Sequence, residues 1–429
     1  MFMKYQEAVE YIEDLSKYGI KPGLDTIKEL CRRLGNPQDT LQFVHIAGSN
    51  GKGSTLAFVS TILKCAGYKV GRYISPTIFE YRERIQVGER PITQKKLCEL
   101  TEQLKIVCDE MVADGFHHPT PFEFETAMAF LYFKEMAVDI VVLETGMGGR
   151  SDATNLITTT KVAVLASISM DHMQYLGDTL EKIASEKAGI VKDGCLVVSQ
   201  KQEGAASGVI QKECEEKHAE LTFVEPEKVK KVRSSLSGQK FNYGKYKDLQ
   251  ITLLGSYQIE NAMLAVEVAE ALGRSGFVIS EAALYKGLKE TKWLGRFSIV
   301  RKKPYFIVDG AHNEDAAKKL AESVAFYFTN KRIIYIMGIL RDKEYEKIIE
   351  LTAKYADQII TVKTPNNPRA MDSYELAREV AKVHPSVTAA ASLEEAVELA
   401  YLLAGKDDVI LSFGSLSYLG AMIKLVENR

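Results

Sequence analysis

The 429-residue sequence lacks a dominant charge, a long apolar run and any cysteine pattern. Lys plus Arg (55) nearly equals Asp plus Glu (57), so the formal net charge is −2 and no general attraction to nucleic acid or anionic lipid is expected. No stretch approaches the roughly 18 apolar residues that span a bilayer, and the acidic N-terminus is unlike a secretory signal. The six cysteines are scattered without a C-x-x-C pair, as in reduced proteins. We therefore expect a cytoplasmic protein, monomeric and without a nucleic-acid or membrane partner.

The chain is too long for one ordinary hydrophobic core, so two domains are expected. Apolar runs alternate with helical patterns along the chain, and a second series of such alternations begins after residues 293–296. The expected domains are residues 1–295 and 296–429. The predicted fold class is α/β: an N-terminal, P-loop-type domain with a mostly parallel sheet, followed by a C-terminal Rossmann-like α/β domain.

Continuous apolar runs, rather than alternating ones, predict strands that are buried on both faces of a parallel sheet. Between 225 and 255 the sequence is polar and patchy, and one or two exposed strands are expected there. The predicted strands are 41–48, 68–75, 138–144, 161–168, 305–310, 331–339, 357–364 and 407–414. Helical spacing predicts helices at 6–19, 24–35, 54–67, 93–112, 122–136, 257–273, 313–328 and 392–404.

A glycine-rich loop, "HIAGSNGKGSTLAF", joins a predicted strand to a predicted helix at residues 45–58. No glycine stands five residues before the Gly51-Lys52 pair, and Gly53 separates the lysine from Ser54, so the spacing differs from that of the common P-loop. Together with Gly48, these glycines let backbone N–H groups and a helix N-terminus bind phosphate oxygens, with Lys52 as a point charge. A tight strand-to-helix turn with a surface lysine is the alternative.

Polar residues follow the other predicted strands of the first sheet. Ser75, Glu144 and the pair Asp171-His172 come directly after three of them, at the edge where ligands gather in parallel sheets. A carboxylate at the end of an apolar strand needs a partner, and Mg²⁺ beside phosphate oxygens is one candidate for Glu144. The alternative is that Glu144 pairs with Arg150 or caps a helix. Taken alone, the serine fits a turn before proline and the histidine an ordinary hydrogen-bonding position.

Further candidates lie outside these strand ends. Asn261 occupies an apolar helix and is either exposed or hydrogen-bonded, an adenine edge being one possible partner. At the predicted domain junction, Arg296 can clamp phosphates. Asp309 and His312 follow a strand, and they fit a ribose hydroxyl and a substrate carboxylate or phosphate, or else a helix N-cap and a packed histidine. By itself Lys187 is an ordinary solvated helix lysine.

Taken together, these motifs resemble those of the folylpolyglutamate synthases, which are ATP-dependent amide ligases of the Mur ligase superfamily. The resemblance covers nearly the whole chain. It rests on "GSNGKGS", "SPTIFEYRERI", "FEFETAMAF", "ETGMGGRSDATN", "DHMQYLGDTLEKIASEKAGI", "GSYQIENAMLA", "GRFSIV", "DGAHN", "TPNNPRAM" and "SFGSLSYLGA". The last of these departs in detail from the family's G-S-L-Y-L-V-G pattern, and Ser49 stands where threonine is usual.

The resemblance implies a role for each candidate. Mg²⁺ would be held by Ser75, Glu144 and His172. Lys187 would be carbamylated, and together with His172, Glu144 and His312 it would form the catalytic set. Near the glutamate or the reacting carboxylate would lie His312 and Ser415. The implied ATP-binding residues are Gly48, Asn50, Gly51, Lys52, Gly53, Ser54, Asn261, Arg296 and Asp309.

The implied activity joins the γ-carboxyl of a tetrahydrofolate or folylpolyglutamate to the amine of L-glutamate, through an acyl phosphate formed from ATP. Three alternatives stay open: dihydrofolate synthase activity, alone or in addition; a peptidoglycan-type Mur ligase; and a nucleotide-binding protein or small-molecule kinase. The second is disfavoured because it calls for a UDP-binding domain ahead of the loop, where only 47 residues precede Gly48. The expected partners are therefore small molecules: folate, L-glutamate and ATP.

Overall fold

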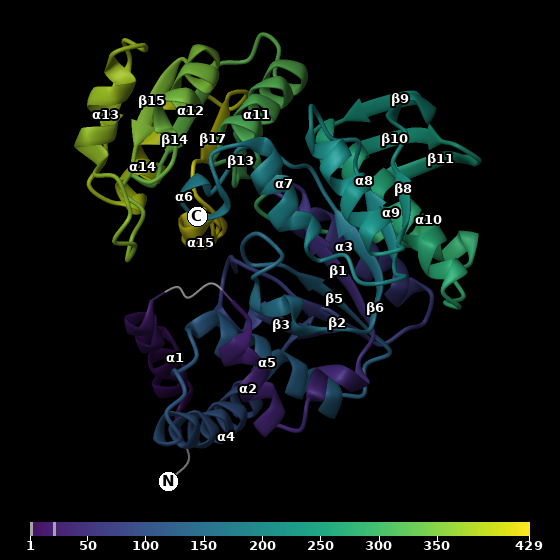
Figure 1. Ribbon diagram of the computed structural model, residues 1–429. Helices are drawn as coiled ribbons and strands as arrows, with labels where there is room; N and C mark the ends of the chain where they lie inside the picture. The colour runs from purple at the N-terminus through teal and green to yellow at the C-terminus, as the bar shows by residue number, and fades with distance from the viewer. Residues whose placement is uncertain (1–2, 20–22) are drawn as a thin grey trace.

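The structure is a computed structural model, and it describes residues 3–19 and 23–429. The largest of its three sheets has eight strands in the order β4-β3-β2-β5-β1-β6-β7-β8 (Figure 1). Neighbouring strands are parallel from β2 to β8, and only β3 and β4 add antiparallel pairs at one edge. The strands are β1 (Phe43–Ala47), β2 (Val70–Tyr73), β3 (Ile85–Val87), β4 (Arg90–Pro91), β5 (Ile140–Glu144), β6 (Thr160–Leu165), β7 (Leu196–Ser199) and β8 (Glu220–Phe223).

Helices cover both faces of this sheet. Alternate residues of a strand point to opposite faces, and here both sets are apolar and buried. One face packs against α3 (Lys52–Cys65), α9 (Tyr257–Arg274) and α10 (Glu281–Glu290). The other is covered by α1 (Tyr5–Asp14), α2 (Asp25–Arg33), α4 (Gln94–Ala113), α5 (Pro121–Glu135), α7 (Leu180–Ala188) and α8 (Ala206–Glu216).

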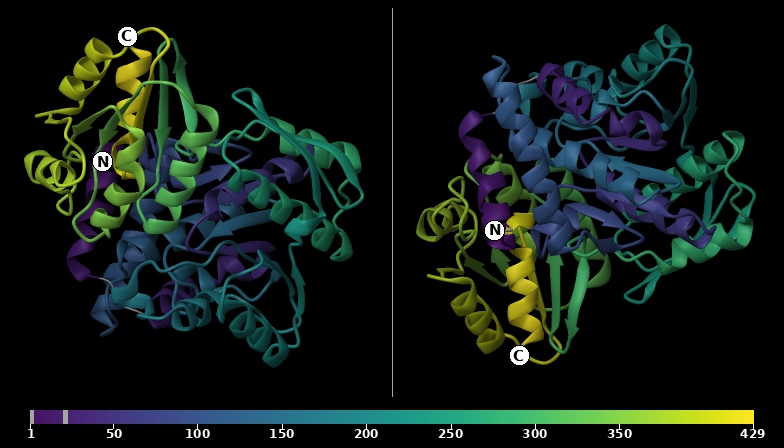
Figure 2. Two further views of the ribbon diagram at one scale, coloured as in Figure 1. Left: turned by 90° about the horizontal axis from the view of Figure 1, so that it is seen from above. Right: turned by 90° about the horizontal axis from the view of Figure 1, so that it is seen from below.

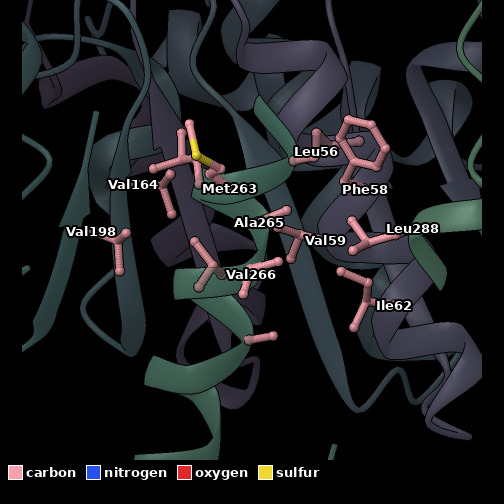
Figure 3. Packing of buried hydrophobic residues seen from close by; sticks show 14 of the residues in the cluster. Leu56, Phe58, Val59, Ile62, Val164, Val198, Met263, Ala265, Val266 and Leu288 are labelled. Atoms are coloured by element: carbon pink, nitrogen blue, oxygen red, sulfur yellow. The ribbon is translucent and has the colours of Figure 1, made fainter. Parts of the chain in front are cut away.

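Helix α3, which follows the glycine loop, is held tightly by the core. All of its residues from 53 to 63 are buried, as expected for a helix between a sheet and further helices. Figure 3 shows Val59 of α3 beside Val266 of α9, and Ile62 of α3 beside Leu288 of α10. Each such side chain contributes about 1.5–3 kcal/mol when fully buried. The end of α3 that carries the glycine loop is therefore rigidly placed.

The segment 225–255 differs from the sequence prediction of one or two exposed strands. It forms three antiparallel strands, β9 (Val229–Ser235), β10 (Gly238–Tyr243) and β11 (Tyr246–Ile251), in the order β11-β10-β9. Phe241, Leu249 and Ile251 are buried in the core shared with α9 and α10. The pattern looks patchy because only one face of this small sheet is covered, whereas its outer residues are polar.

The third sheet contains only residues from 298 onward and has the order β12-β13-β17-β14-β15-β16. All its neighbours are parallel except the pair of β12 and β13. Its strands are β12 (Ser298–Lys302), β13 (Tyr305–Asp309), β14 (Ile333–Met337), β15 (Gln358–Thr361), β16 (Val387–Ala389) and β17 (Val409–Phe413). The helices α11 (Glu314–Tyr327), α12 (Tyr345–Thr352), α13 (Ser373–Ala381), α14 (Leu393–Leu403) and α15 (Leu419–Glu427) cover it.

The two large sheets lie side by side, and the three-stranded sheet flanks them, with Leu236 packed against the core of the C-terminal part (Figure 2). The predicted α/β class and every predicted strand outside 225–255 are confirmed. The strand predicted at 68–75 is shorter, since it leaves the sheet at Tyr73 before the Ser75–Pro76 peptide. Within the described residues, no helix is long and apolar enough to cross a membrane.

Candidate active site

The glycine loop connects β1 to the first turn of α3, and two of its glycines are required by side chains that lie against them. Gly51 has φ +85°, and a Cβ there would lie 2.5 Å from Oδ1 of Asn261. A Cβ on Gly53 would lie 2.9 Å from the ring of Trp293. The alternative of a surface lysine is wrong: Lys52 is half-buried, and its Nζ donates to the carbonyl of Gly48 over 3.0 Å.

A narrow cavity of ≈ 150 Å³ opens beside this loop. Both large sheets contribute to its wall, because the loops after β1, β2, β5 and β6 face the loop after β13 across it. Most of the predicted site residues meet here: Asn50, Gly51, Lys52, Gly53, Ser54, Ser75, Glu144, His172, Asn261, Arg296, Asp309 and His312. The predicted convergence of strand ends is therefore present in the structure.

Glu144 is the buried carboxylate of the cavity, with 5% of its surface exposed. Burial raises its pKa, while the nearby ammonium of Lys52 acts in the opposite direction. Its hydrogen bond from the N–H of Ser75 is long, at 3.4 Å. The alternative that Glu144 pairs with Arg150 is wrong, because the Arg150 guanidinium bonds Glu213 instead, at 2.7 Å.

Lys187 is not a solvated helix lysine, and that alternative is wrong. Only 3% of the residue is exposed, and its Nζ donates to the carbonyl of Gly48 over 3.0 Å. Lys52 donates to the same oxygen, so two ammonium groups face one acceptor. Burial, and then the charge of Lys52, lower the pKa of Lys187 to about 7. An amine with this pKa is substantially unprotonated at neutral pH.

His172 begins the short helix α6 (Met173–Leu176) with φ +50°, at the rim of the cavity. Burial lowers its pKa, and the carboxylate of Asp171 opposes that shift. Asp171 itself bonds Nζ of Lys343 at 3.0 Å and accepts from Nδ2 of Asn313 at 3.4 Å. Burial would raise the pKa of Asp171, but Lys343 and the nearby imidazoles hold it below its usual range.

The Asp171–Lys343 pair joins the two large sheets, and the sequence reasoning missed its lysine. Lys343 follows β14 by six residues, so its place near a strand's carboxyl end was the one signal available. A second link crosses the same gap, where Nδ2 of Asn50 donates to Asp315 over 2.8 Å.

Asp309 is not a helix N-cap, because Asn313 caps α11 by accepting from the N–H of Ala316. The carboxylate accepts instead from the N–H groups of Phe297 and Ala311, both at 2.7 Å. Burial raises its pKa, whereas Arg296 lowers it. Asn261 is buried and hydrogen-bonded, which settles that choice against exposure.

The imidazole of His312 lies 2.7 Å from the carbonyl of Gly310 through Nδ1, so Nδ1 carries the proton of the neutral ring. Burial, with the charge of Lys343, lowers its pKa to about 4. His312 also lines a second cavity, of ≈ 790 Å³, together with Phe122, Asp152 and Ser415. Ser415 thus lies outside the narrow cavity but on the wall of the adjoining one.

A sheet that presents a glycine loop to a second α/β sheet across a narrow cavity defines a Mur-type ligase architecture. The family model described as "Mur ligase middle domain" matches residues 46–269, and "Mur ligase, glutamate ligase domain" matches residues 295–416.

Relatives place the chain more closely. It is 36% identical over 433 residues to the dihydrofolate synthase/folylpolyglutamate synthase of Bacillus subtilis, covering 99% of both chains. It superposes on the crystal structure of folylpolyglutamate synthase from Thermotoga maritima with a TM-score of 0.86 and 34% identity, covering 99% of this chain and 97% of that one. For the Mycobacterium tuberculosis folylpolyglutamate synthase complexed with ADP and AMPPCP, the TM-score is 0.90, with 29% identity, 98% of this chain and 99% of that one. The chain belongs to the folylpolyglutamate synthase family of the Mur ligase superfamily.

Proposed function

We propose that this chain uses ATP to join the γ-carboxyl of a tetrahydrofolate, or of its oligoglutamate tail, to the amine of L-glutamate. One observation carries the proposal: a glycine-rich loop and a buried carboxylate line one narrow cavity, which adjoins a larger one, and a buried lysine with a lowered pKa bonds the Gly48 carbonyl of that loop. The large cavity is partly aromatic, through Phe122, and has room for a pterin and its benzoyl group.

The nucleotide is assigned to the narrow cavity. The loop amides, Lys52 and Ser54 bind its phosphates at the N-terminus of α3. Asn261, which lies against Gly51, is assigned to hydrogen-bond the base. On the opposite wall, Asp309 is assigned to the ribose and Arg296 to the phosphates. The remaining assigned phosphate-loop residues are Gly48, Asn50, Gly51 and Gly53. Residues 1–295 and 296–429 are the two domains that this arrangement calls for, with the reaction in the cleft between them.

The residues present fit a magnesium ion, which the family resemblance implies. A hard divalent ion prefers oxygen ligands, and the single hydrogen bond that the described residues give the buried Glu144 carboxylate is long. Ser75, whose N–H makes that bond, and His172 on the same cavity wall complete the assigned ligand set. Among the described residues no group of three or more His, Cys, Asp or Glu side chains is placed to hold a metal, so phosphate oxygens and water must supply further ligands. When bound, the ion neutralises charge on the phosphates.

In the first step, a carboxylate oxygen of the folate substrate attacks the γ-phosphorus of ATP, and the bond from that phosphorus to the ADP oxygen breaks. Lys52 and the loop N–H groups stabilise the charge that develops on the phosphoryl oxygens. The amine of glutamate then attacks the acyl carbon, and phosphate leaves. His312 is neutral at pH 7, and its Nε2 is available to accept the proton that the amine loses. Ser415, on the adjoining cavity wall, is assigned to bind substrate.

Lys187 is assigned as a carbamate. Its unprotonated, neutral amine attacks CO₂: a new N–C bond forms, one C–O π bond of CO₂ opens to give a carboxylate, and one proton is released, so a neutral buried group becomes an anion. The carbamate attracts the ammonium of Lys52, whereas a protonated Lys187 is repelled by it. Six cysteines that are all free thiols fit a reducing compartment, and we place the protein in the cytoplasm as a monomer.

Dihydropteroate is the second candidate acceptor, because the Bacillus subtilis relative is named for both activities. The test is ADP release by the purified protein with Mg-ATP and L-glutamate, in parallel reactions with tetrahydrofolate, with dihydropteroate or with neither. Products are identified by mass spectrometry. Gain of one glutamyl unit on tetrahydrofolate supports the proposal, and the same gain on dihydropteroate adds the second activity. ADP release in neither reaction overturns both, and equal release without any acceptor indicates an ATPase or kinase instead.

A further inference from the structure

A chain of amide side chains runs beneath the nucleotide cavity. Gln258 of α9 is completely buried and does not line the cavity. Its Nε2 donates to Oγ of Ser54 over 3.2 Å, and its Oε1 accepts from Nδ2 of Asn261 over 3.0 Å. Asn261 in turn accepts, through Oδ1, from Nε2 of Gln200 at 3.2 Å. Because Ser54, Asn261 and Gln200 all line the cavity, the chain of hydrogen bonds leaves the cavity wall and returns to it.

The direction of these hydrogen bonds decides what Ser54 can offer to a ligand. An amide has a donating nitrogen end and an accepting oxygen end, so linked amides must all turn together or lose a bond. In the present direction Ser54 accepts from Gln258, and its own proton is free. Phosphate oxygens accept hydrogen bonds, and this direction therefore suits a bound triphosphate. In the reverse direction the Ser54 proton would go to Gln258 and nothing would be left for the phosphate.

The same direction fixes the amide of Asn261. With Nδ2 facing Gln258 and Oδ1 facing Gln200, Asn261 retains one donor proton and one acceptor lone pair. A donor–acceptor pair of this kind matches an adenine edge, which offers an amino group beside a ring nitrogen. A base with a carbonyl in place of that amino group, such as hypoxanthine, would require the reversed amide. The amide also lies close to the glycine loop, since a Cβ on Gly51 would be 2.5 Å from Oδ1.

We propose that Gln258 is a positioning residue that couples recognition of the phosphates to recognition of the base. Gln258 itself contacts neither the phosphates nor the base. The proposal rests on the assignment of the narrow cavity to ATP. Reversal of Asn261 to suit another base would reverse Gln258 and withdraw the Ser54 proton from the phosphate. The protein's preference for adenine nucleotides thus depends on Gln258, a residue that does not line the cavity.

Two substitutions at this position separate the two ends of the chain of hydrogen bonds. Leucine makes no hydrogen bond and releases Asn261, so Gln258→Leu lowers the preference for ATP over ITP about tenfold, as expected for the loss of roughly one hydrogen bond. Glutamate accepts from both neighbours, so Gln258→Glu keeps Asn261 in place but takes the Ser54 proton. It therefore weakens ATP and ITP binding by similar factors and leaves their ratio unchanged.

The experiment measures Kd for ADP and IDP by calorimetry with the full-length chain, and kcat and KM for ATP and ITP where turnover is found. Gln239→Leu is the matched control, since Gln239 is a buried amide of β10 that accepts from Ser234, donates to the main-chain carbonyls of Leu253 and Gly255, and does not line the cavity. It lowers the melting temperature without changing the ratio. Circular dichroism verifies folding of each variant.

An unchanged ADP:IDP ratio in Gln258→Leu overturns the coupling, as does a wild-type chain that binds ADP and IDP equally. So does a Gln258→Glu variant that binds as tightly as wild type. Failure of the proposed ligase activity has a different signature: no folate-dependent ADP release while nucleotide binding and its ratio persist. Should Gln258→Leu not fold, the folded Gln258→Glu variant alone decides the matter.

Discussion

Replacing Glu144 by glutamine is expected to stabilise the nucleotide-free protein and to remove its response to Mg-ATP. The carboxylate is buried, and burial raises its pKa. Each pH unit of such a shift corresponds to about 1.4 kcal/mol against the charged form. With Lys52 offsetting part of this cost, we expect Glu144→Gln to gain about 1–2 kcal/mol at pH 7, or about 1–4 °C in melting temperature. A raised carboxyl pKa destabilises the folded state only at pH values above the pKa of that group in the unfolded chain. The stability gained by Glu144→Gln therefore disappears as the pH falls through the pKa of Glu144 in the folded protein toward 4.5.

In the presence of Mg-ATP the substitution has the opposite effect on stability. A ligand at 100 times its Kd stabilises the folded state by about 2.7 kcal/mol, and the variant loses this because the carboxylate assigned to the metal is gone. A thermal melt with and without Mg-ATP measures both effects. Glu213→Gln is the control, since Glu213 pairs with Arg150 away from the cavity, and it keeps the full Mg-ATP response. The reasoning fails if Glu144→Gln keeps that response, or if its nucleotide-free form melts lower than wild type at pH 7.

Four further outcomes are expected. Lys187→Met abolishes turnover. The CO₂ concentration that gives half of the maximal wild-type activity is higher at pH 6 than at pH 8, because an amine with a pKa of about 7 must be unprotonated to form the carbamate; steady-state assays over a bicarbonate series test this, and the same half-saturating concentration at both pH values refutes it. Gly51→Ala weakens ADP binding more than tenfold, since its Cβ meets an amide oxygen at a positive φ, whereas Gly208→Ala, in open space on α8, leaves the Kd unchanged. Lys343→Met leaves Asp171 buried without its ion-pair partner and destabilises the fold by about 3–5 kcal/mol, measurable in urea; a loss below 1 kcal/mol contradicts this.

The parts of the site that follow strand ends were predictable from the sequence. Glu144 and Asp309 each end a continuous apolar run, and a parallel sheet brings such ends to one edge. The glycine loop was predictable for the same reason, since it stands between a strand and a helix. Local pattern and topology were sufficient for these residues.

Residues whose role depends on contacts between distant segments were not predictable in this way. Lys187 has the helical spacing of an exposed residue, and only its packing against the Gly48 carbonyl removes it from solvent. Gln258 and Lys343 acquire their partners across 204 and 172 residues of sequence. At 229–251 the sequence predicted one or two exposed strands where three form, because solvent-facing residues dilute the apolar pattern of this small sheet.

The most direct test of the central claim is the mass of the product formed from tetrahydrofolate, L-glutamate and Mg-ATP by the purified wild-type chain. The account predicts a product heavier by one glutamyl unit, one ADP released for each unit added, and neither product when glutamate is omitted. ADP release that is independent of both folate and glutamate, or no release with any acceptor, would contradict it.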